Sequence, residues 1–288
     1  MFDEKKNDTC DFRLTSSSST VENRSFLFWG FNRANIKRTS LYKEFLANDR
    51  NLTFDMSDYS LQVKNELLTQ THKDVLEALL TFNTSFSTQD IAVSSSSVMS
   101  FLGKNSKNTS WLFDILEELN NVNIRYFKKN TSSDIIFADG FKILSSLSYD
   151  SDDNIVFSFH DSFLSLYEKG KLLSYCKYTP FISNLDHDIS KQVVRWLLTY
   201  DYLQINISNL LSNKLGLKNV VKKRSLYNYI ALIKEEDLSM FGIWVEGDNI
   251  CIDRSKVVNF FDGKDIGKFK GSEKVKIKQS TLPFFDLS

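Results

Sequence analysis

The sequence predicts an α+β protein of two tandem winged-helix domains, with flexible N- and C-terminal tails. In such a domain a helix-turn-helix is followed by a β-hairpin wing. The first observation behind this prediction is a pattern of a short helix, a glycine, a basic turn and a second helix. The pattern runs from Gly103 to a helix led by Leu112, and again from Gly216 to a helix led by Leu226, with separations of 9 and 10 residues. The second observation is a hairpin pattern after each second helix: apolar and polar residues alternate from Val122, and two apolar runs flank a tight polar turn at 246–249.

The first winged-helix domain is expected at residues 24–176, after a polar, serine-rich and disordered tail over residues 1–23. Apolar residues three and four positions apart predict its helices, and strict alternation predicts its strands. In chain order we expect a strand at 26–29, a basic loop at 33–43, an extended segment at 52–56, helices at 72–82, 94–103 and 108–120, a hairpin at 122–137 as the wing, more strand at 141–159, and a short helix at 163–170.

The second winged-helix domain is expected at residues 177–262, with the boundary near Pro180. Val193, Trp196 and Leu197 lie on one face of its first helix because their spacing matches the helical period. Its remaining elements are a helix at 208–215 with Gly216 as the C-cap, a third helix at 222–234, a tight hairpin at 243–252 as the second wing, and then a flexible tail at 263–288.

Composition limits the classes of function. With 288 residues, of which 42% are hydrophobic, the chain is long enough for about two domains. Its formal net charge is zero, so any binding of nucleic acid has to come from local basic patches. Residues 214–234 carry six Lys or Arg and no acid, and residues 24–50 carry six Lys or Arg and two acids. Such runs often mark a solvated helix face, but a run at the front of a recognition helix is also what DNA binding requires.

Catalysis, metal binding and membrane insertion are not expected. Cys10, Cys176 and Cys251 are far apart and odd in number, so they indicate neither a disulfide framework nor a zinc site and fit a reducing cytoplasm. The three histidines are isolated and no phosphate-binding glycine loop occurs, which argues against a metallohydrolase and an ATPase. No stretch approaches 18 apolar residues, and no signal-peptide pattern is present. The sequence therefore predicts a binding protein that is not an enzyme and uses no cofactor.

The third helix of the second domain is the predicted recognition helix. A helix in the major groove needs cations and amides on its front and apolar residues at its rear. We expect Arg224 to contact a guanine and Asn228 to pair with an adenine, with the neighbouring lysines on phosphates. The alternative is that these are ordinary surface residues of a protein-interaction domain. The predicted contacts of this domain are Lys218, Lys222, Lys223, Arg224, Ser225, Tyr227, Asn228 and Arg254.

The first domain offers a weaker set of contacts. Its helix at 108–120 carries Asp114, Glu117 and Glu118, which phosphates would repel unless these acids point away. We therefore expect the second domain to carry most of the sequence recognition, and the first to add backbone contacts and a dimer surface. The predicted contacts of the first domain are Lys104, Asn105, Lys107, Asn108 and Ser110 and, in its wing, Arg125, Lys128 and Lys129.

Several motifs in fixed order resemble the TrfA-type plasmid replication initiators, and together they span roughly residues 23–262. That family has an Arg-Ser-x-Leu-Phe strand, a basic stretch, a helix with Asp-x-x-Val and paired leucines, a Leu-Gly turn before a Trp-Leu helix start, and a Lys-x-x-x-x-Trp-Leu helix. The corresponding segments here are residues 23–28, 37–41, 71–80, 101–112 and 190–197.

This resemblance implies tandem winged helices that bind repeated origin sequences (iterons), open a neighbouring AT-rich segment and help to load the host's replicative helicase. It also implies a protein that is active as a monomer on DNA and forms a homodimer in the DNA-free state. The chain departs from the family in its neutral net charge and in the acids of its first recognition helix. Both departures bear on the strength of the first domain's DNA contact.

The C-terminal tail carries a second motif. Gln279, Leu282, Phe284 and Phe285 fit the bacterial sliding-clamp-binding pattern Gln-x-x-Leu-x-Leu-Phe, with Phe284 in place of one leucine. A flexible tail can present one polar and three large apolar groups to a preformed groove. The alternative is a tail strand that packs on its own domain. TrfA-type initiators are known for contact with the clamp, so the resemblance implies this partner too.

The sequence as a whole predicts a plasmid or phage replication initiator that binds double-stranded DNA at origin repeats. Its expected partners are the host helicase or its loader and the sliding clamp, with no membrane involved. Two alternatives stay open at this point. One is a winged-helix transcriptional repressor, and the other is a protein–protein adaptor that does not bind nucleic acid.

Overall fold

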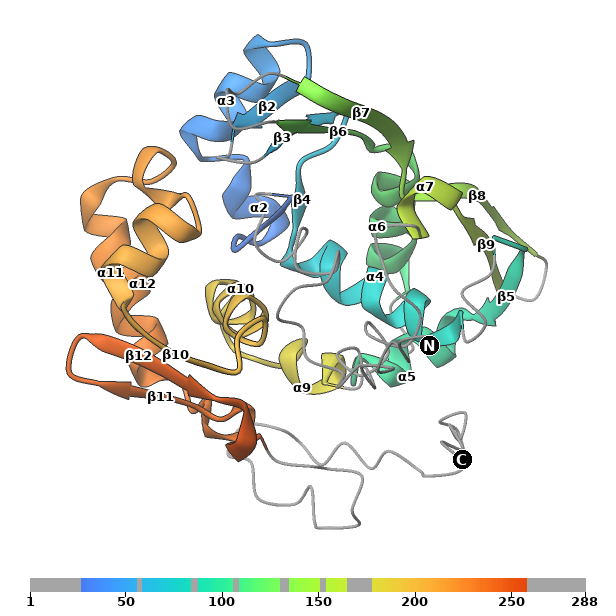
Figure 1. The fold of residues 1–288 in the computed structure, drawn as a ribbon. Coiled ribbons are helices and arrows are strands. Elements are labelled where there is room, and N and C mark those ends of the chain that lie inside the picture. The colour runs from blue at the N-terminus through green and yellow to red at the C-terminus, as the bar shows by residue number, and fades with distance from the viewer. Residues whose placement is uncertain are drawn as a thin grey trace, which may run out of the picture.

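The protein forms a mixed α/β fold of two halves that meet at two central helices, α4 (Gln70–Phe82) and α10 (Asp188–Leu197) (Figure 1). The predicted tails at 1–23 and 263–288 lie outside the residues that the structure describes. The computed structural model describes residues 27–55, 59–83, 88–105, 109–129, 135–150, 154–164 and 178–257.

The N-terminal segment begins with a parallel strand pair and two short helices. The pair consists of β1 (Phe28–Trp29) and β4 (Leu68–Thr69). The predicted basic loop at 33–43 is wrong, because α2 (Arg33–Ile36) and α3 (Ser40–Ala47) occupy it. Each helix starts at a capping side chain, since Asn32 Oδ1 accepts from the Asn35 amide at 2.7 Å and Thr39 Oγ1 accepts from the Tyr42 amide at 3.2 Å. Buried Ile36, Leu41 and Phe45 then hold these helices on the core.

A four-stranded antiparallel sheet covers the side of the first half that lies at the top of Figure 1. Its inner face is apolar, with Leu52, Val63, Ile124 and Phe141 buried in one row across the strands. Its strands, in spatial order, are β2 (Asn51–Asp55), β3 (Tyr59–Lys64), β6 (Asn123–Lys129) and β7 (Ile135–Lys142).

The predicted first wing at 122–137 is therefore wrong as a wing. The hairpin exists, but β6 pairs with β3 along its length, so the hairpin is the outer half of this sheet rather than a free arm. The reason is its alternation: the apolar side of the hairpin packs on the same core as β2 and β3. A pattern of alternation cannot say which sheet a hairpin joins.

Both halves contain a unit of the same order, which is helix, strand, helix, helix, strand, strand. In each unit the last strand lies between the other two, because the sheet orders are β5-β9-β8 and β10-β12-β11. The first unit consists of α4, β5 (Ile91–Ser94), α5 (Ser95–Phe101), α6 (Ser110–Asn121), β8 (Leu144–Tyr149) and β9 (Asn154–Phe159), followed by α7 (Asp161–Leu164). Strands β6 and β7 are inserted between its last helix and its last two strands.

The second half starts with α9 (Thr179–Ile182) and then repeats the unit. Its elements are α10, β10 (Tyr202–Asn206), α11 (Ile207–Asn209) with a π-helical continuation at Leu210–Lys214, a 3₁₀ turn at Leu217–Asn219, α12 (Lys223–Glu235), a 3₁₀ turn at Ser239–Phe241, β11 (Ile243–Glu246), β12 (Asn249–Asp253) and a 3₁₀ turn at Arg254–Lys256.

The two glycines of the repeated pattern end their helices as expected. Gly103 has a φ of 66° and Gly216 a φ of 71°, a left-handed conformation that favours glycine after the last helical turn. Within the described ranges, every helix is too short or too polar to cross a bilayer.

Candidate nucleic-acid interface

Helix α12 presents one exposed face and packs its opposite face on the second half. Ile233 is fully buried, and Leu226 and Ile230 pack against the core beside it. Helices α10 and α11 both contact α12 and support it from behind (Figure 1). The side chains on the outward face are exposed, and they are those of Lys222, Lys223, Arg224, Tyr227, Asn228 and Ala231. The predicted division of this helix into a polar front and an apolar rear is confirmed.

The charge of the exposed face lies at the start of α12. Lys222 is the N-cap, and Lys223 and Arg224 are the first two helical residues. Within the described residues none of these three cations makes an ion pair. The N-terminus of a helix carries a partial positive charge, which makes cations there unfavourable by about 0.3–1 kcal/mol each. Stability therefore does not explain this placement, whereas an anionic ligand would benefit from the cations and the helix dipole together.

Aromatic and polar groups complete the face. Tyr227 is 60% exposed, and the Lys223 ammonium lies 6.0 Å from the centre of its ring. Ser225 is only half-buried, so its hydroxyl also lies at the edge of the surface. At the other end of the helix, Lys234 pairs with Asp248 of the β11–β12 turn at 2.8 Å. The free positive charge of α12 is thus confined to its first turn.

The other two predicted contacts of the second half differ from each other. Lys218 is exposed in the 3₁₀ turn before α12. Arg254 instead lies with its Nη1 3.5 Å from Asp201 Oδ1, and its side chain is 22% exposed. Arg254 is therefore held back against the start of β10, while Lys218 extends the surface of α12.

The basic segment at 37–43 lies beside the start of α12, although it belongs to the first half. Ser40 Oγ donates to the Val220 carbonyl at 3.1 Å, two residues before Lys222. The rings of Phe31 and Tyr229 also meet at 6.2 Å. Exposed Lys37, Arg38 and Lys43 thus join the same part of the molecule. Sequence reasoning noticed the patch but had no means of placing it, because the contact joins residues 180 positions apart.

The corresponding helix of the first half, α6, has an acidic exposed side. Glu118 receives hydrogen bonds from Arg33 and from His72 Nε2, the latter at 2.6 Å, and Arg33 also lies 3.5 Å from Asp114. Glu117 Oε1 accepts from the Tyr149 hydroxyl at 3.2 Å. These acids are held by neighbouring side chains, so α6 does not present cations as α12 does.

The proton arrangement at His72 follows from its partners. Its Nδ1 accepts from the Thr69 amide at 3.0 Å, so Nε2 carries the proton and donates to Glu118. Burial lowers the pKa of His72, which keeps the ring neutral. Partial burial opposes ionisation of Glu118, but the hydrogen bonds from His72 and Arg33 outweigh it and lower the pKa of Glu118 to about 2.

The remaining predicted contacts of the first half fall in three groups. Lys104, Asn105 and Ser110 are exposed residues, but Lys104 Nζ lies 3.3 Å from the Ser183 carbonyl and from Asn184 Oδ1, and partial burial lowers the pKa of Lys104. Arg125 is exposed on the four-stranded sheet rather than on a wing. Lys107 and Asn108 lie outside the described residues, as do the side chains of Lys128 and Lys129 and the whole clamp motif with Gln279, Leu282, Phe284 and Phe285.

A buried ionic cluster joins the two halves behind these surfaces. Arg195 of α10, 2% exposed, donates through Nη2 to Asp74 and to Glu77 at 2.7 Å each, and through Nη1 to Gln70 at 2.7 Å. Lys191 Nζ lies 2.9 Å from Asp74 Oδ2. The cluster ties α10 to α4 and so holds the position of α12 relative to the first half.

Sequence reasoning missed this cluster. The signal was present, because α4 carries the acids Asp74 and Glu77 three positions apart and α10 carries the cations Lys191 and Arg195 four positions apart. Matched spacings of opposite charge on two buried helices indicate facing partners. Thr179 adds a further link, since its hydroxyl donates to Glu77 Oε2 at 2.6 Å.

Metal and thiol chemistry find little support in the described part of the chain. No group of three His, Cys, Asp or Glu side chains is arranged there to hold a metal ion. Cys251, on the central strand β12, is a free and buried thiol. Burial raises the pKa of the Cys251 thiol, so its surroundings do not favour a reactive thiolate.

Comparison with known proteins gives a likeness of fold. No protein-family profile matches the sequence, and no curated protein sequence matches it significantly. The fold is similar to that of domains 2 and 3 of RctB in the crystal structure of their selenomethionine derivatives. That match has a TM-score of 0.51 and 13% identity, and covers 70% of this chain and 90% of the other. A second structure of RctB domains 2–3 matches with a TM-score of 0.47 and 12% identity, over 70% and 88% of the two chains. At this identity the likeness shows a shared fold alone, and it does not single out the TrfA family.

Proposed function

We propose that both repeated units are winged helices and that the protein is a DNA-binding replication initiator that recognises origin repeats through α12. The observation that carries this proposal is the unpaired, acid-free first turn of α12, exposed at the front of a helix whose rear is buried. A solvated helix face normally mixes both signs of charge. Three cations placed against the helix dipole are better explained by an anionic partner.

Each side chain of the face has a role in this proposal. Arg224 donates two hydrogen bonds to O6 and N7 of a guanine, and Asn228 pairs with an adenine one helical turn further on. Lys222 and Lys223 contact phosphates and fix the register of the helix. Tyr227 lies between the two base-reading positions and is exposed enough to contact the backbone.

The fold supports this reading at the level of analogy. RctB is a replication initiator, and two of its domains share this arrangement of helices and sheets at low identity. Because one fold hosts many functions, the argument for DNA rests on the residues of α12 and not on the likeness alone. The acidic exposed side of α6 agrees with a lesser role of the first half in sequence recognition.

The first test selects binding sequences from a random duplex library and compares variants on the selected and on unrelated DNA. Arg224→Ala should weaken binding to the selected sequence by about 1–3 kcal/mol, roughly tenfold to a hundredfold, and much less on unrelated DNA. Lys234→Ala is the matched control, since it removes a cation of the same helix that is already paired with Asp248. Equal loss on both DNAs would leave Arg224 as a phosphate contact without a reading role.

A salt titration separates an initiator from an adaptor. A DNA reader must lose affinity steeply as salt rises, because cations on phosphates release counterions when they bind. Absence of duplex binding at low salt would reject the proposal. In the DNA that neighbours the gene, the selected sequence should occur as direct repeats about two helical turns apart, beside an AT-rich stretch.

The remaining partners belong to the same proposal. We propose that the host helicase or its loader and the sliding clamp bind the protein, the clamp through residues 279–285, and that the DNA-free protein is a homodimer. Capture of purified sliding clamp by the full chain, lost in Leu282→Ala/Phe285→Ala, tests the clamp contact and distinguishes an initiator from a transcriptional repressor. Capture that is unchanged in this double variant would assign the contact to another surface.

A further inference from the structure

We propose that the outer face of the sheet β2-β3-β6-β7 is a second nucleic-acid surface, separate from α12, which binds the phosphate backbone of duplex DNA. The sheet lies in the first half, where α6 itself offers an acidic side. Its outer face therefore supplies a positive surface to the half of the molecule whose expected recognition helix lacks one.

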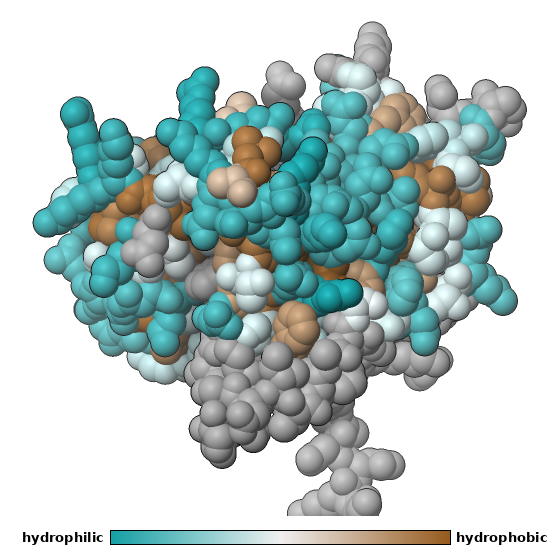
Figure 2. Space-filling view, turned by 90° about the horizontal axis from the view of Figure 1, so that it is seen from above, coloured by the Kyte–Doolittle hydropathy of each residue, from teal (hydrophilic) through white to brown (hydrophobic). Residues whose placement is uncertain are grey.

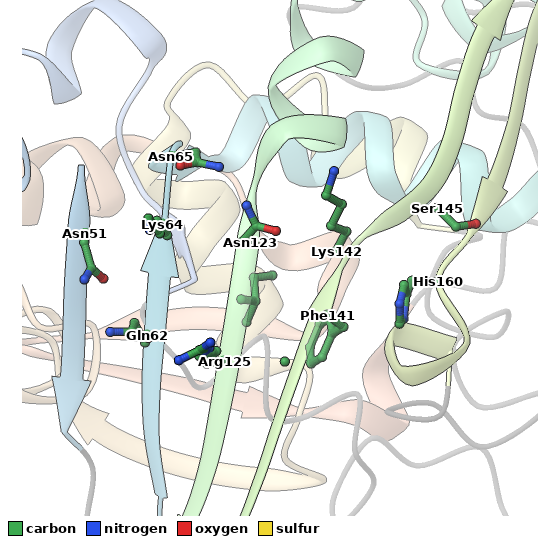
Figure 3. Close-up of a pocket in the computed structure, with 12 residues that line it drawn as sticks. Asn51, Gln62, Lys64, Asn65, Asn123, Arg125, Phe141, Lys142, Ser145 and His160 are labelled. Carbon is green, nitrogen blue, oxygen red and sulfur yellow. The ribbon is translucent and has the colours of Figure 1, made fainter. Parts of the chain in front are cut away.

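The register of the four strands aligns polar side chains in rows across this face. One row runs Asn51, Lys64, Asn123 and Lys142, and these residues are direct partners on successive strands. In the next row Gln62 pairs with Arg125. Because successive side chains of a strand point to opposite faces, these rows lie opposite the buried apolar row of the same sheet. Figure 3 shows them from the four strands around a common hollow.

The hollow over these rows is open to solvent and has a volume of about 830 Å³. Its described lining includes the cations Lys64, Arg125 and Lys142 and no carboxylate. Within the described residues the side chains of these three cations make no ion pair and no hydrogen bond. The outward face of an antiparallel sheet is ordinarily a solvated mixture of charges. Three unpaired cations without an acid are unusual in a chain that contains 36 acidic and 36 basic residues.

The Arg125 side chain lies across the sheet, over a residue of β7 that has no side chain. A Cβ added to Gly140, its partner on β7, would lie 3.3 Å from Arg125 Cγ and 3.7 Å from its Nε. The arginine stem therefore lies over the glycine, and its guanidinium stays near the surface of the sheet. Strands lie roughly 4.8 Å apart, so Lys64 and Lys142, two strands from each other, have Cα atoms on the order of 10 Å apart. This spacing is within reach of phosphates on one side of a duplex.

The chemistry of the hollow favours phosphates over bases. Single strands are bound through exposed aromatic rings on which bases stack. The described lining holds two rings: Phe141 is only 6% exposed and belongs to the core, and His160 is half-buried, with its Nδ1 accepting from the Ser162 amide at 3.2 Å. The other polar groups are the three cations, the Ser145 hydroxyl and four side-chain amides, all of which suit the oxygens of a backbone; the amides are those of Asn51, Gln62, Asn65 and Asn123. Figure 2, which looks onto the side of the molecule that carries the sheet, shows a mainly hydrophilic surface with only separate hydrophobic patches.

The choice of DNA among polyanions rests on the proposed function. The experiment therefore measures affinity as a function of salt on selected duplex, unrelated duplex and single-stranded DNA, for the full chain and two triple variants. Lys64→Gln/Arg125→Gln/Lys142→Gln removes the charge. Lys64→Arg/Arg125→Lys/Lys142→Arg keeps it and is the matched control. All three side chains are exposed, so thermal unfolding should not change.

The neutral variant should make the negative slope of log affinity against log salt shallower by roughly 2–3, since each lost phosphate contact removes about 0.9 from its magnitude. If affinity at 1 M salt is unchanged, this corresponds near 0.1 M salt to a loss of roughly a hundredfold to a thousandfold on both duplexes, with the ratio between them unchanged. The charge-keeping variant should retain the slope.

A folded neutral variant with an unchanged slope would overturn the inference, as would an equal loss in the charge-keeping variant. A loss confined to single strands would overturn the assignment to duplex. If the protein binds both duplexes equally and the neutral variant alone weakens them, this inference stands and the proposed role of α12 fails. If only Arg224→Ala weakens binding, the role of α12 stands and this inference fails.

Discussion

Replacement of Arg195 by methionine tests the ionic cluster that joins the two halves. Methionine fills a similar volume but removes a guanidinium that donates to Asp74, Glu77 and Gln70. Glu77 is fully buried and Asp74 nearly so. The substitution therefore leaves two carboxylates inside the protein with fewer partners, and the loss of compensation determines its cost.

The size of the destabilisation depends on which partners Asp74 and Glu77 keep when Arg195 is replaced. Lys191 still pairs with Asp74 at 2.9 Å, so that carboxylate keeps a cation. Glu77 keeps the Thr179 hydroxyl, and Lys73 Nζ lies at 3.7 Å from its Oε1. Breaking a buried pair by removing one partner costs about 3–5 kcal/mol. We expect a loss of this size in the free energy of unfolding.

The assay is urea unfolding followed by tryptophan fluorescence, with Arg254→Met as the control. Arg254 pairs with Asp201 at 3.5 Å near the surface, so its loss should cost less than about 1 kcal/mol. Glu77→Gln should destabilise the wild-type protein but recover part of the stability of Arg195→Met, because it removes the unpaired charge. A cost below about 1 kcal/mol for Arg195→Met, or no recovery in the double variant, would refute the reasoning.

The remaining predictions concern acid and two glycines. The pKa of His72 is lowered, so the unfolded chain takes up its proton first, and stability should begin to fall as the pH drops below about 6.5. Glu118, with a pKa of about 2, adds a further loss of stability as the pH falls from about 4.5 towards 2. The prediction for His72 would be contradicted by an acid unfolding curve in which His72→Gln keeps the wild-type slope of stability against pH between pH 6.5 and 5. Gly242→Ala should cost more than Gly247→Ala, since both have a positive φ but only the first would place its Cβ 2.3 Å from a backbone oxygen, that of Asp253. We expect about 1 kcal/mol for Gly247→Ala and at least 2 for Gly242→Ala by thermal unfolding, and equal costs would refute the assigned clash.

Local chemistry made the second half largely predictable. The helical period predicts α12 to within a residue of its observed bounds, because this signal acts over a few positions. The exposed front of α12 followed from the same periodicity. Arg254 did not follow, since its partner Asp201 lies 53 positions away.

In the first half, local sequence patterns predict less, because its elements depend on contacts between distant segments. The alternation at 122–137 correctly predicts two strands but wrongly predicts a wing, because the partner strand β3 lies about sixty positions earlier in the chain. The sequence predicts a loop at 33–43 because the two helices there are short, and buried residues rather than helix propensity hold them in place.

The amino-acid sequence alone specifies the repeated helix–glycine–turn–helix pattern, the polar and apolar sides of its helices and the cations that open α12. Each of these is a local property of a few neighbouring residues. Three features come from tertiary packing instead: Arg195 faces Glu77, the basic segment at 37–43 lies beside α12, and Lys64, Arg125 and Lys142 share one face. The physical reason is that these contacts join distant segments, and the partner of a buried charge or of a strand edge depends on how the whole core packs.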